Sequence, residues 1–335
     1  MSDTAPSAAP FDDVRDLALR QITPDIAPAE QVREALLNMG REGDFGRLGE
    51  AAGWLAQWQK RYPPRIENAT LAIFAGAHGI SGGGVSLSSD KNTKSKVDAL
   101  RSGEAPLSAI AAQVGANIRV FELAIEQPTA DFTDGAAMSE RECAATIAYG
   151  FEALEGQPDL LALGVIGAGI GTAAAAVACA LYGGSADYWV RPGPLTPKDM
   201  SASRTGIVDA ALAKHRGHLD DPLEALRCVG GRELAACVGA ILAARIQSVP
   251  VVLDGFATTI AAGIVHAINP EAVSHVCSAH VTKRPAHQAA LDRLDMRPLL
   301  PVEFNTGGGM GSAAATGILK TACAPFIGRP APSES

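Results

Sequence analysis

The amino-acid sequence predicts an α/β protein with a parallel sheet of about six strands and helices on both faces of that sheet. Short apolar runs of strand length alternate with longer segments rich in Ala and Leu, which is typical of βαβ units. The runs are continuously hydrophobic, because a strand of a parallel sheet is buried on both sides. A content of 35 glycines with only 5% aromatic residues favours tight turns and close packing of helices on the sheet.

The predicted elements fall into two kinds of segment. Apolar residues at helical spacing predict three helices near the start of the chain, at 12–20, 28–39 and 48–62. Strand signals begin after residue 65 and predict strands at 70–75, 118–124, 160–166, 187–190, 249–253 and 273–277. The segments between the strands predict helices at 94–114, 139–154, 173–181 and 232–247. A glycine loop and a further Ala-rich helix follow near the end of the chain.

This distribution predicts that the two chain ends pack together as a small helical domain. We expect three parts: N-terminal helices of the small domain in residues 1–65, a large α/β domain in 66–288, and a C-terminal glycine loop with helices that join the small domain in 289–328. The segments 1–10 and 329–335 are rich in Ser, Ala and Pro, which predicts disorder.

Charge and composition exclude several classes of function. The net charge is −8 and no basic block occurs, so nucleic acid is not an expected partner, because its phosphates are bound by clustered Lys and Arg. The sequence has no apolar stretch of about 18 residues and no secretory signal, so we expect no membrane span. Six scattered cysteines without a CxxC pair predict reduced, mostly buried thiols in a cytoplasmic protein, with neither disulfides nor a metal site.

Candidate ligand-binding residues follow directly after predicted strands. Ligands of parallel α/β sheets bind beyond the carboxyl ends of the strands, so these positions are candidate sites. They are residues 76–79, 167–171, 254–256 and 278–280.

The segment 164–176 reads Gly-Val-Ile-Gly-Ala-Gly-Ile-Gly-Thr-Ala-Ala-Ala-Ala and joins a strand to a helix. Glycines allow the backbone to approach a ligand closely, and the N–H groups at a helix start favour an anion. The segment is therefore either a phosphate site or a tight turn without a ligand. A nicotinamide-dinucleotide site is a third interpretation, because Asp187 lies about 20 residues further on, although Thr172 replaces the last glycine of that motif.

Other candidates also have two interpretations each. Asp254 follows a strand, where a carboxylate serves either a site or the N-cap of the next helix. His280 and His287 form either an anion contact or part of a solvated basic turn, and their spacing is not a zinc signature. The glycine loop at 81–86 lines a pocket or is a mobile surface loop. The loop at 307–311 is a second phosphate site or a closely packed helix start.

Eight segments of the chain together resemble one known family. They are FAGAHG (74–79), GVS (84–86), AMS (137–139), GVIGAGIGTAAAA (164–176), DPLEALRCVGGRE (221–233), PVVLDGF (250–256), the segment from His280 to His287, and GGGMGSAAA (307–315). Their order is similar to that of the nicotinate-nucleotide:dimethylbenzimidazole phosphoribosyltransferase family, which activates the lower ligand of cobalamin. The likeness extends from about residue 20 to residue 325.

The resemblance implies a Rossmann-like sheet with a small helical domain, a homodimer, and a reaction without metal or cofactor. It implies transfer of the phosphoribosyl group of nicotinate mononucleotide to 5,6-dimethylbenzimidazole, which yields α-ribazole 5′-phosphate and nicotinate. Such a reaction needs a base for the benzimidazole proton, a phosphate site and a dry pocket that aligns the two rings.

The resemblance also implies the residues of the site. The phosphate would lie on Gly167, Gly169, Gly171, Thr172 and Lys214. The base and ribose would lie in a pocket formed by His78, Gly84, Ser86, Asp254, Gly307, Gly309 and Gly311.

The sequence departs from the family at acidic positions. Gly308 stands where the family has its catalytic Glu, in a loop that reads L-G-E-G-T-G-A-A. Three more family acids are replaced, at Ala77, Val165 and Arg284. The remaining candidates for the base are Glu303, five residues before Gly308, and His280, together with Asp254, Glu233 and His78.

Three functions follow as hypotheses. The first is a phosphoribosyltransferase that acts on a nucleotide and an azole. The second is a paralogue that binds a nucleotide or a benzimidazole-like ligand without turnover, because the family's Glu is absent at position 308. The third, a dinucleotide oxidoreductase, depends only on the turn at 167–172 and Asp187.

Overall fold

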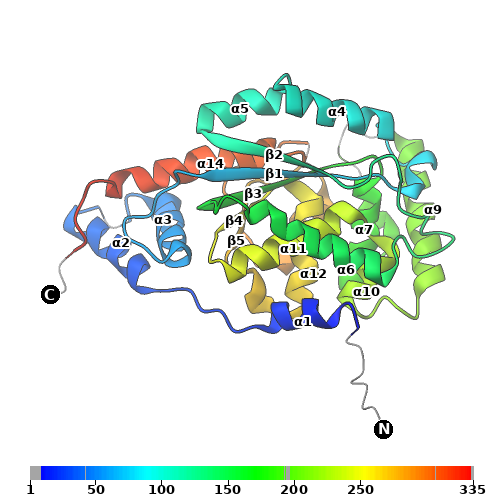
Figure 1. Ribbon diagram of the computed structural model, residues 1–335, viewed down its shortest axis with the longest axis horizontal. Helices are drawn as coiled ribbons and strands as arrows, with labels where there is room; N and C mark the ends of the chain where they lie inside the picture. Colours follow the sequence, from blue (N-terminus) through cyan, green and yellow to red (C-terminus); the bar gives the residue numbers. More distant parts are fainter. Residues whose placement is uncertain (1–8, 42, 192, 194–196, 306, 333–335) are drawn as a thin grey trace, which may run out of the picture.

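A computed structural model describes residues 9–41, 43–191, 193, 197–305 and 307–332. Most of the two segments predicted to be disordered, residues 1–8 and 333–335, lies outside these ranges. Among the described residues, five parallel strands form one sheet in the order β2-β1-β3-β4-β5 (Figure 1). The strands are β1 (Ala69–Ala75), β2 (Ala116–Glu122), β3 (Leu160–Ile166), β4 (Val251–Leu253) and β5 (Val276–Ser278).

The predicted sixth strand, residues 187–190, is wrong, because this segment belongs to helix α8 (Ala186–Val190). Ser185 caps the helix by accepting a hydrogen bond from the N–H of Tyr188 at 3.3 Å. The indole of Trp189 is buried and donates to the carbonyl of Gly183 at 2.7 Å. A short apolar run has too few residues for its period to separate a strand from a buried helix, and the N-cap decides it here.

Helices cover both faces of the sheet. One face and the neighbouring edge strand β2 are covered by helices that include those near the chain ends. They are α2 (Ala27–Asn38), α3 (Gly46–Gln59), α4 (Asp90–Ser102), α5 (Pro106–Val114) and α14 (Met310–Cys323). The opposite face and its surroundings hold α1 (Asp12–Leu19), α6 (Glu140–Tyr149), α7 (Ile170–Tyr182), α9 (Lys198–His215), α10 (Pro222–Val229), α11 (Arg232–Ile246), α12 (Gly255–Ile268) and α13 (Pro285–Arg293). Short 3-10 turns are η1 (Gly79–Gly82), η2 (Gly150–Leu154), η3 (Pro270–Val273) and η4 (Ala324–Phe326).

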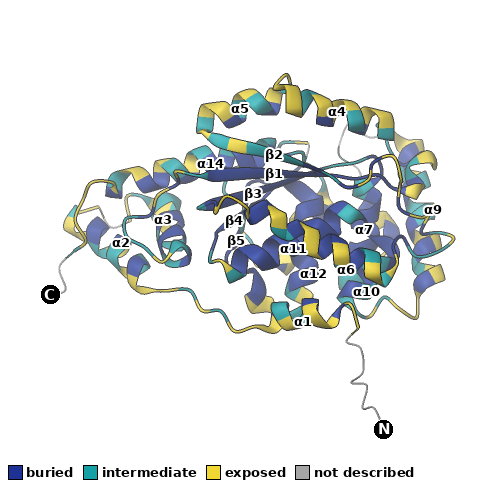
Figure 2. Ribbon diagram, viewed as in Figure 1, coloured by how far each residue is buried: buried dark blue, intermediate teal, exposed yellow. Residues whose placement is uncertain are grey.

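Alternate strand residues supply two hydrophobic cores. Leu71 and Ile73 of β1 face a core with α3, α5 and α14, whereas Ala72 and Phe74 face a larger core with α7, α11 and α12. In Figure 2, β1 is coloured as buried along its length. Burial on both sides is why these strands are continuously apolar in sequence.

The predicted helix at 94–114 is two helices, α4 and α5. Gly103 ends α4 in the left-handed conformation, at φ +79°, and Pro106 occupies the first turn of α5. Glycine at the end of one helix and proline at the start of the next are the residues that favour such a break.

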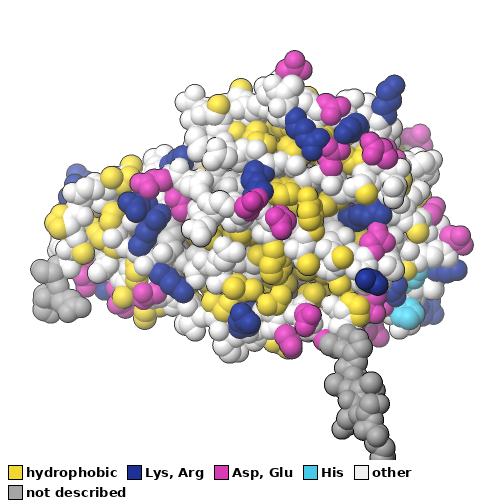
Figure 3. Space-filling model, viewed as in Figure 1, with side chains coloured by type: hydrophobic (Ala, Val, Ile, Leu, Met, Phe, Trp, Pro, Cys, Tyr) yellow, Lys and Arg dark blue, Asp and Glu magenta, His cyan; other side chains and the backbone are white. Residues whose placement is uncertain are grey.

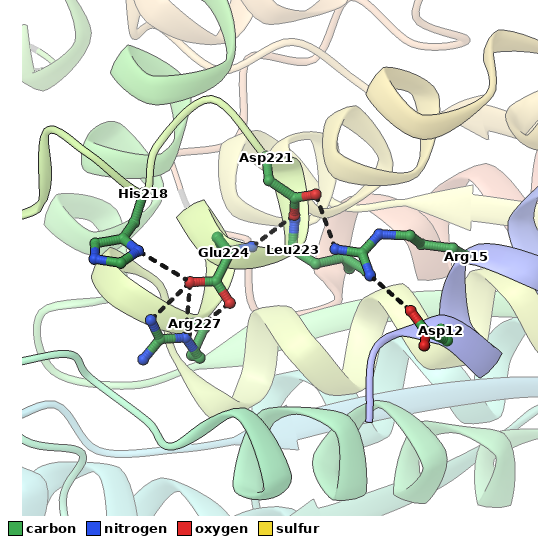
Figure 4. A network of polar contacts seen from close by, with 7 residues as sticks. All are labelled: Asp12, Arg15, His218, Asp221, Leu223, Glu224 and Arg227. Carbon is green, nitrogen blue, oxygen red and sulfur yellow. Dashed lines mark hydrogen bonds and ion pairs between the residues drawn. The ribbon is translucent and has the colours of Figure 1, made fainter. Parts of the chain in front are cut away.

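The N-terminal helices pack in two different places. Helices α2 and α3 contact each other, and α3 contacts α14 from the opposite end of the chain. Helix α1 instead contacts α12, and Phe11 joins the larger core on the sheet. Arg15 of α1 forms an ion pair at 2.9 Å with Asp221, the N-cap of α10 (Figure 4). The division into a large and a small domain stays a prediction.

The described residues contain no helix that is both long enough and apolar enough to cross a membrane. On the face drawn in Figure 3, acidic and basic side chains are interspersed around apolar ones.

Candidate active site

The carboxyl ends of the strands gather most of the candidate residues at one edge of the sheet. His78 follows β1, the glycine turn 167–171 follows β3, Asp254 follows β4 and His280 follows β5. A pocket of about 110 Å³ opens at this edge. It is lined by Val165, Ile170, Gly171, Phe256, Ala257, Thr282, Arg284, Asn305 and Gly307.

Asp254 and His280 form a fully buried pair in which His280 Nε2 lies 2.6 Å from Asp254 Oδ1. The same carboxylate accepts hydrogen bonds from the backbone N–H groups of Gly309 and Gly311. Burial raises the pKa of Asp254, and the hydrogen bonds from His280 and the two glycines oppose that rise. These contacts make Asp254 the anchor of the glycine loop. Asp254 occupies the N-cap position of α12, but its side chain forms no capping hydrogen bond with that helix.

Three glycines of the loop at 307–311, Gly307, Gly309 and Gly311, pack too closely against their neighbours to carry a Cβ. A Cβ on Gly311 would lie 2.6 Å from Asp254 Oδ1, and one on Gly307 would lie 2.8 Å from the carbonyl oxygen of Asp254. Gly309 has φ +104°, which favours glycine, and caps α14. The carbonyl of Gly307 accepts a hydrogen bond from Val165 of β3 at 2.9 Å, so the loop closes one side of the pocket.

A second buried pair joins His78 and Glu233, with His78 Nε2 at 2.6 Å from Glu233 Oε1. Cβ atoms on Gly76, Gly167 and Gly231 would each lie within 3.0 Å of this pair. Gly167 is therefore a glycine because Glu233 fills the space beside it. The partners are 155 residues apart, and the sequence signal for Glu233 is the Gly230-Gly231 dipeptide at the start of its helix.

The start of α7 is the part of the predicted phosphate site that faces the pocket. Gly169 is the N-cap at φ +91°, and Ile170 and Gly171 line the pocket. The hydroxyl of Thr172 is buried and has no hydrogen-bond partner among the described residues. The first N–H groups of a helix also lack partners within the helix, so this end of α7 favours an anion.

Arg284, in the loop after β5, brings a positive charge to the same place. Its Nη1 lies 2.9 Å from the position of a Cβ on Gly171. Burial lowers the pKa of Arg284, and burial together with the charge of Arg284 lowers the pKa of Arg204 to about 10. Within the described ranges, neither guanidinium forms an ion pair, and Arg204 donates only to the carbonyl of Val85 at 2.8 Å. The sequence offers an anion contact as one interpretation of the segment from His280 to His287, and the structure places Arg284 of this segment in the pocket lining beside Gly171.

His287, the other histidine of this segment, is held by both ring nitrogens. Its Nδ1 accepts from the N–H of Thr282 at 3.0 Å, and its Nε2 lies 3.1 Å from the hydroxyl of Thr259. Burial lowers the pKa of His287 to about 3. Both ring nitrogens of His287 are therefore engaged by contacts within the protein.

Several predicted site residues lie away from the pocket lining. Lys214 is exposed in the last turn of α9, and Asp187 is exposed in α8. Glu303 is exposed and pairs with Lys283 at 3.2 Å. Ser86 accepts from the N–H of Ser88, and Gly84 is exposed at φ +72°. These residues are not part of the pocket lining, which residues near the strand ends form.

Comparisons with known proteins confirm the resemblance. A family model described as phosphoribosyltransferase matches residues 22–328. The nicotinate-nucleotide–dimethylbenzimidazole phosphoribosyltransferase of Brucella canis is 41% identical over 317 residues, which cover 94% of each chain. The protein of the same name from Sinorhizobium fredii is 44% identical over 319 residues, which cover 95% of this chain and 94% of the relative.

A solved structure agrees with these relatives. The crystal structure of the nicotinate-nucleotide–dimethylbenzimidazole phosphoribosyltransferase of Thermus thermophilus has a TM-score of 0.80 and 28% identity to this chain. The structural match covers 89% of this chain and 95% of the chain in that crystal structure. This chain belongs to the nicotinate-nucleotide:dimethylbenzimidazole phosphoribosyltransferase family.

Proposed function

We propose that this protein transfers the phosphoribosyl group of nicotinate mononucleotide to 5,6-dimethylbenzimidazole or a related azole. The products are α-ribazole 5′-phosphate and nicotinate, for the assembly of the nucleotide loop of cobalamin. The observation that carries the proposal is the pocket at the carboxyl ends of the strands. There the Arg284 guanidinium, which has no ion-pair partner among the described residues, and the N-terminus of α7 adjoin apolar walls.

The phosphate lies at the start of α7 in this proposal. Gly171 and the N–H groups of the first turn bind it, the hydroxyl of Thr172 donates to it, and Arg284 pairs with it. Gly167 and Gly169 shape the turn, because their side-chain positions face Glu233 and His78.

The aromatic rings lie against the apolar wall. Val165, Ile170, Phe256 and Ala257 exclude water from the reacting atoms and hold the azole opposite C1′ of the ribose. The azole nitrogen attacks C1′ while the bond to nicotinate breaks. Because the leaving pyridinium carries a positive charge, it departs as a neutral ring without a metal.

The cellular setting is part of the same proposal. We place the protein in the cytoplasm because of its cysteines, and we propose a homodimer, as the resemblance implies. Six free cysteines, five of them buried, suit a reducing compartment. Light scattering coupled to size exclusion tests the dimer.

The proposed reaction is tested by titration calorimetry of the full chain with nicotinate mononucleotide, followed by product analysis after addition of 5,6-dimethylbenzimidazole. The expected result is binding and formation of α-ribazole 5′-phosphate. Binding without product supports the second candidate, a binder without turnover, which the glycine at position 308 favours. No binding of the nucleotide rules out the proposed transfer from nicotinate mononucleotide and means that the pocket takes a different ligand.

A further inference from the structure

We propose that residues 301–305 form a strap that closes the pocket, and that the ion pair between Lys283 and Glu303 holds this strap in its closed position. The closure rests on the proposed function, because it controls the entry of the two substrates of that reaction. The size of the pocket, the contacts of its lining and the backbone of the strap all indicate it.

The pocket is too small for the two molecules that the proposed reaction joins. Its volume is about 110 Å³. That is roughly the volume of four water molecules. Sites for small molecules in proteins usually enclose roughly 300 to 1,000 Å³. The structure therefore shows a closed state, and part of the lining must move before a nucleotide and an azole can enter together.

Most of the lining is held in place. Thr282 donates its N–H to His287 Nδ1 at 3.0 Å, and the N–H of Arg284 donates to the Thr282 hydroxyl at 3.4 Å. The carbonyl of Gly307 accepts from Val165 at 2.9 Å. The other fixed lining residues belong to β3, α7 and α12, and they are Val165, Ile170, Gly171, Phe256 and Ala257.

The strap is the part of the lining that is free to move. Its first neighbour, Leu300, is anchored to the sheet by donating to the carbonyl of Ala279 at 2.8 Å. Gly307 anchors the chain beyond its other end. Between these anchors, residues 301–305 form no backbone hydrogen bond within the described part of the chain. Four of the five are exposed, and Asn305 lines the pocket.

Two side-chain contacts hold the strap down. Lys283 Nζ, on the fixed loop that carries Arg284, lies 3.2 Å from Glu303 Oε2. The ring of Phe304 packs on His280 with centroids 5.4 Å apart. A Cβ on Gly193 would lie 3.9 Å from Arg284 Cγ and 4.0 Å from Asn305 Oδ1, so the strap and the fixed loop meet beside the pocket.

The backbone of Glu303 is strained in this closed position. Its φ is +48°, in the left-handed region that residues other than glycine rarely adopt. Such a conformation persists only where surrounding contacts hold it, and it is found at switch regions. Loss of the ion pair with Lys283 lets Glu303 return to an ordinary conformation, which gives the strap a second, open state.

A closed state that excludes the substrates makes an unusual prediction about binding. The apparent Kd equals the intrinsic Kd divided by the fraction of open molecules. Breaking the ion pair should therefore tighten binding, whereas loss of a contact that merely supports the pocket would weaken it. An exposed ion pair shifts such an equilibrium by about 1.5- to 5-fold.

The first experiment measures opening of the strap without any ligand. Chymotrypsin cleaves after aromatic residues, so its rate of cleavage after Phe304, followed by mass spectrometry of the full chain, reports the open fraction. Lys283→Gln breaks the ion pair and leaves the sequence of the strap unchanged. We expect cleavage about 1.5- to 5-fold faster than in the parent, and added salt should accelerate the parent more than the variant.

Arg65→Gln is the matched control for this experiment. Arg65 and Glu67 form an ion pair at 3.6 Å with side chains 50% and 69% exposed, compared with 45% and 59% for Lys283 and Glu303. The control pair precedes β1, at the amino edge of the sheet. Arg65→Gln should be cleaved after Phe304 at the parent's rate. An unchanged rate in Lys283→Gln, or an equal increase in the control, overturns the strap.

The second experiment measures access to the pocket. Calorimetry compares Glu303→Gln with the parent for binding of 5,6-dimethylbenzimidazole, an uncharged azole, because removal of an acid by itself attracts a phosphate. We expect a Kd about 1.5- to 5-fold lower in Glu303→Gln and the parent's Kd in Glu67→Gln. Unchanged or weaker binding in Glu303→Gln overturns the role of the ion pair in closing the pocket.

Failure of the proposed function has a different signature. A parent that binds the azole and nicotinate mononucleotide but forms no α-ribazole 5′-phosphate overturns the proposed transfer. Faster cleavage of Lys283→Gln and tighter azole binding by Glu303→Gln would still support the strap in that case.

Discussion

Nε2 of His280 lies 2.6 Å from Oδ1 of Asp254, and both side chains are fully buried. The pair joins the ends of two neighbouring strands, β4 and β5, and the same carboxylate holds the glycine loop. The wall of the pocket is therefore arranged before any substrate arrives, which is the condition for positioning two rings in line.

Gly311→Ala is expected to disrupt this arrangement. The added Cβ would lie 2.2 Å from the His280 ring, and overpacking of this kind costs about 1 to 3 kcal/mol of unfolding free energy. Gly206→Ala is the control, since nothing lies within 4 Å of its Cβ position in the exposed middle of α9, and it should gain up to about 1 kcal/mol. Denaturant unfolding measures both, and equal stabilities would contradict the role of the close contact.

Arg284→Ala is expected to weaken binding of nicotinate mononucleotide by about 10- to 100-fold, because a charge-assisted hydrogen bond to phosphate is lost. Added salt should weaken binding to the parent more than binding to the variant. Arg293→Ala is the control on the neighbouring helix, where the guanidinium lies over the ring of Tyr182. Calorimetry checks both, and similar affinities for the two variants would remove Arg284 from the phosphate site.

His275 should make the protein less stable in acid. Burial lowers the pKa of His275 to about 3, whereas the unfolded value is about 6.5, so the unfolded state binds the extra proton between these values. The contribution of the neutral ring to the free energy of unfolding is therefore fully present above pH 6.5. Below that value it falls by about 1.4 kcal/mol per pH unit for this group.

The check on His275 is the slope of unfolding free energy against pH. His275→Gln should reduce that slope between about pH 6 and pH 4, since the amide does not titrate. A parent slope that persists in His275→Gln would show that other groups cause the acid sensitivity.

The contact between Arg15 and Asp221 should contribute modestly to stability (Figure 4). Burial opposes ionisation of Asp221, but the N–H groups of Glu224 and Leu223 and the Arg15 guanidinium outweigh it and lower its pKa. Asp221→Ala loses the N-cap of α10 as well as the ion pair and should cost about 1 kcal/mol, whereas Arg15→Ala should cost less.

The pH dependence distinguishes this pair from simple packing. A lowered pKa means that the contribution of Asp221 is present above the unfolded value near 3.9 and is lost as the pH falls through the folded value. Melting temperatures of Asp221→Ala and the parent should therefore converge in strong acid. A difference that is the same at every pH would assign the effect to packing alone.

Local sequence patterns determined most of the strands and the edge at which the site lies. The run at 160–166 is β3 residue for residue, and Asp254 and His280 follow β4 and β5 as predicted. A buried parallel strand is marked by its own apolar residues, so it is visible locally. The segment at 187–190 was wrongly predicted as a strand. Its N-cap and the burial of Trp189, and not its composition, make it helical.

The pairing of residues was decided only by the tertiary structure. His78 meets Glu233 across 155 positions, and His280 meets Asp254 across 26. The glycines of the two loops predict close approach of the backbone to a ligand. In the structure these glycines also pack against buried carboxylate and imidazole side chains. The sequence shows which residues follow each strand. The order of the strands in the sheet and the packing of the helices decide which of these residues are in contact. The chemistry of the site therefore depends on contacts that no local pattern contains.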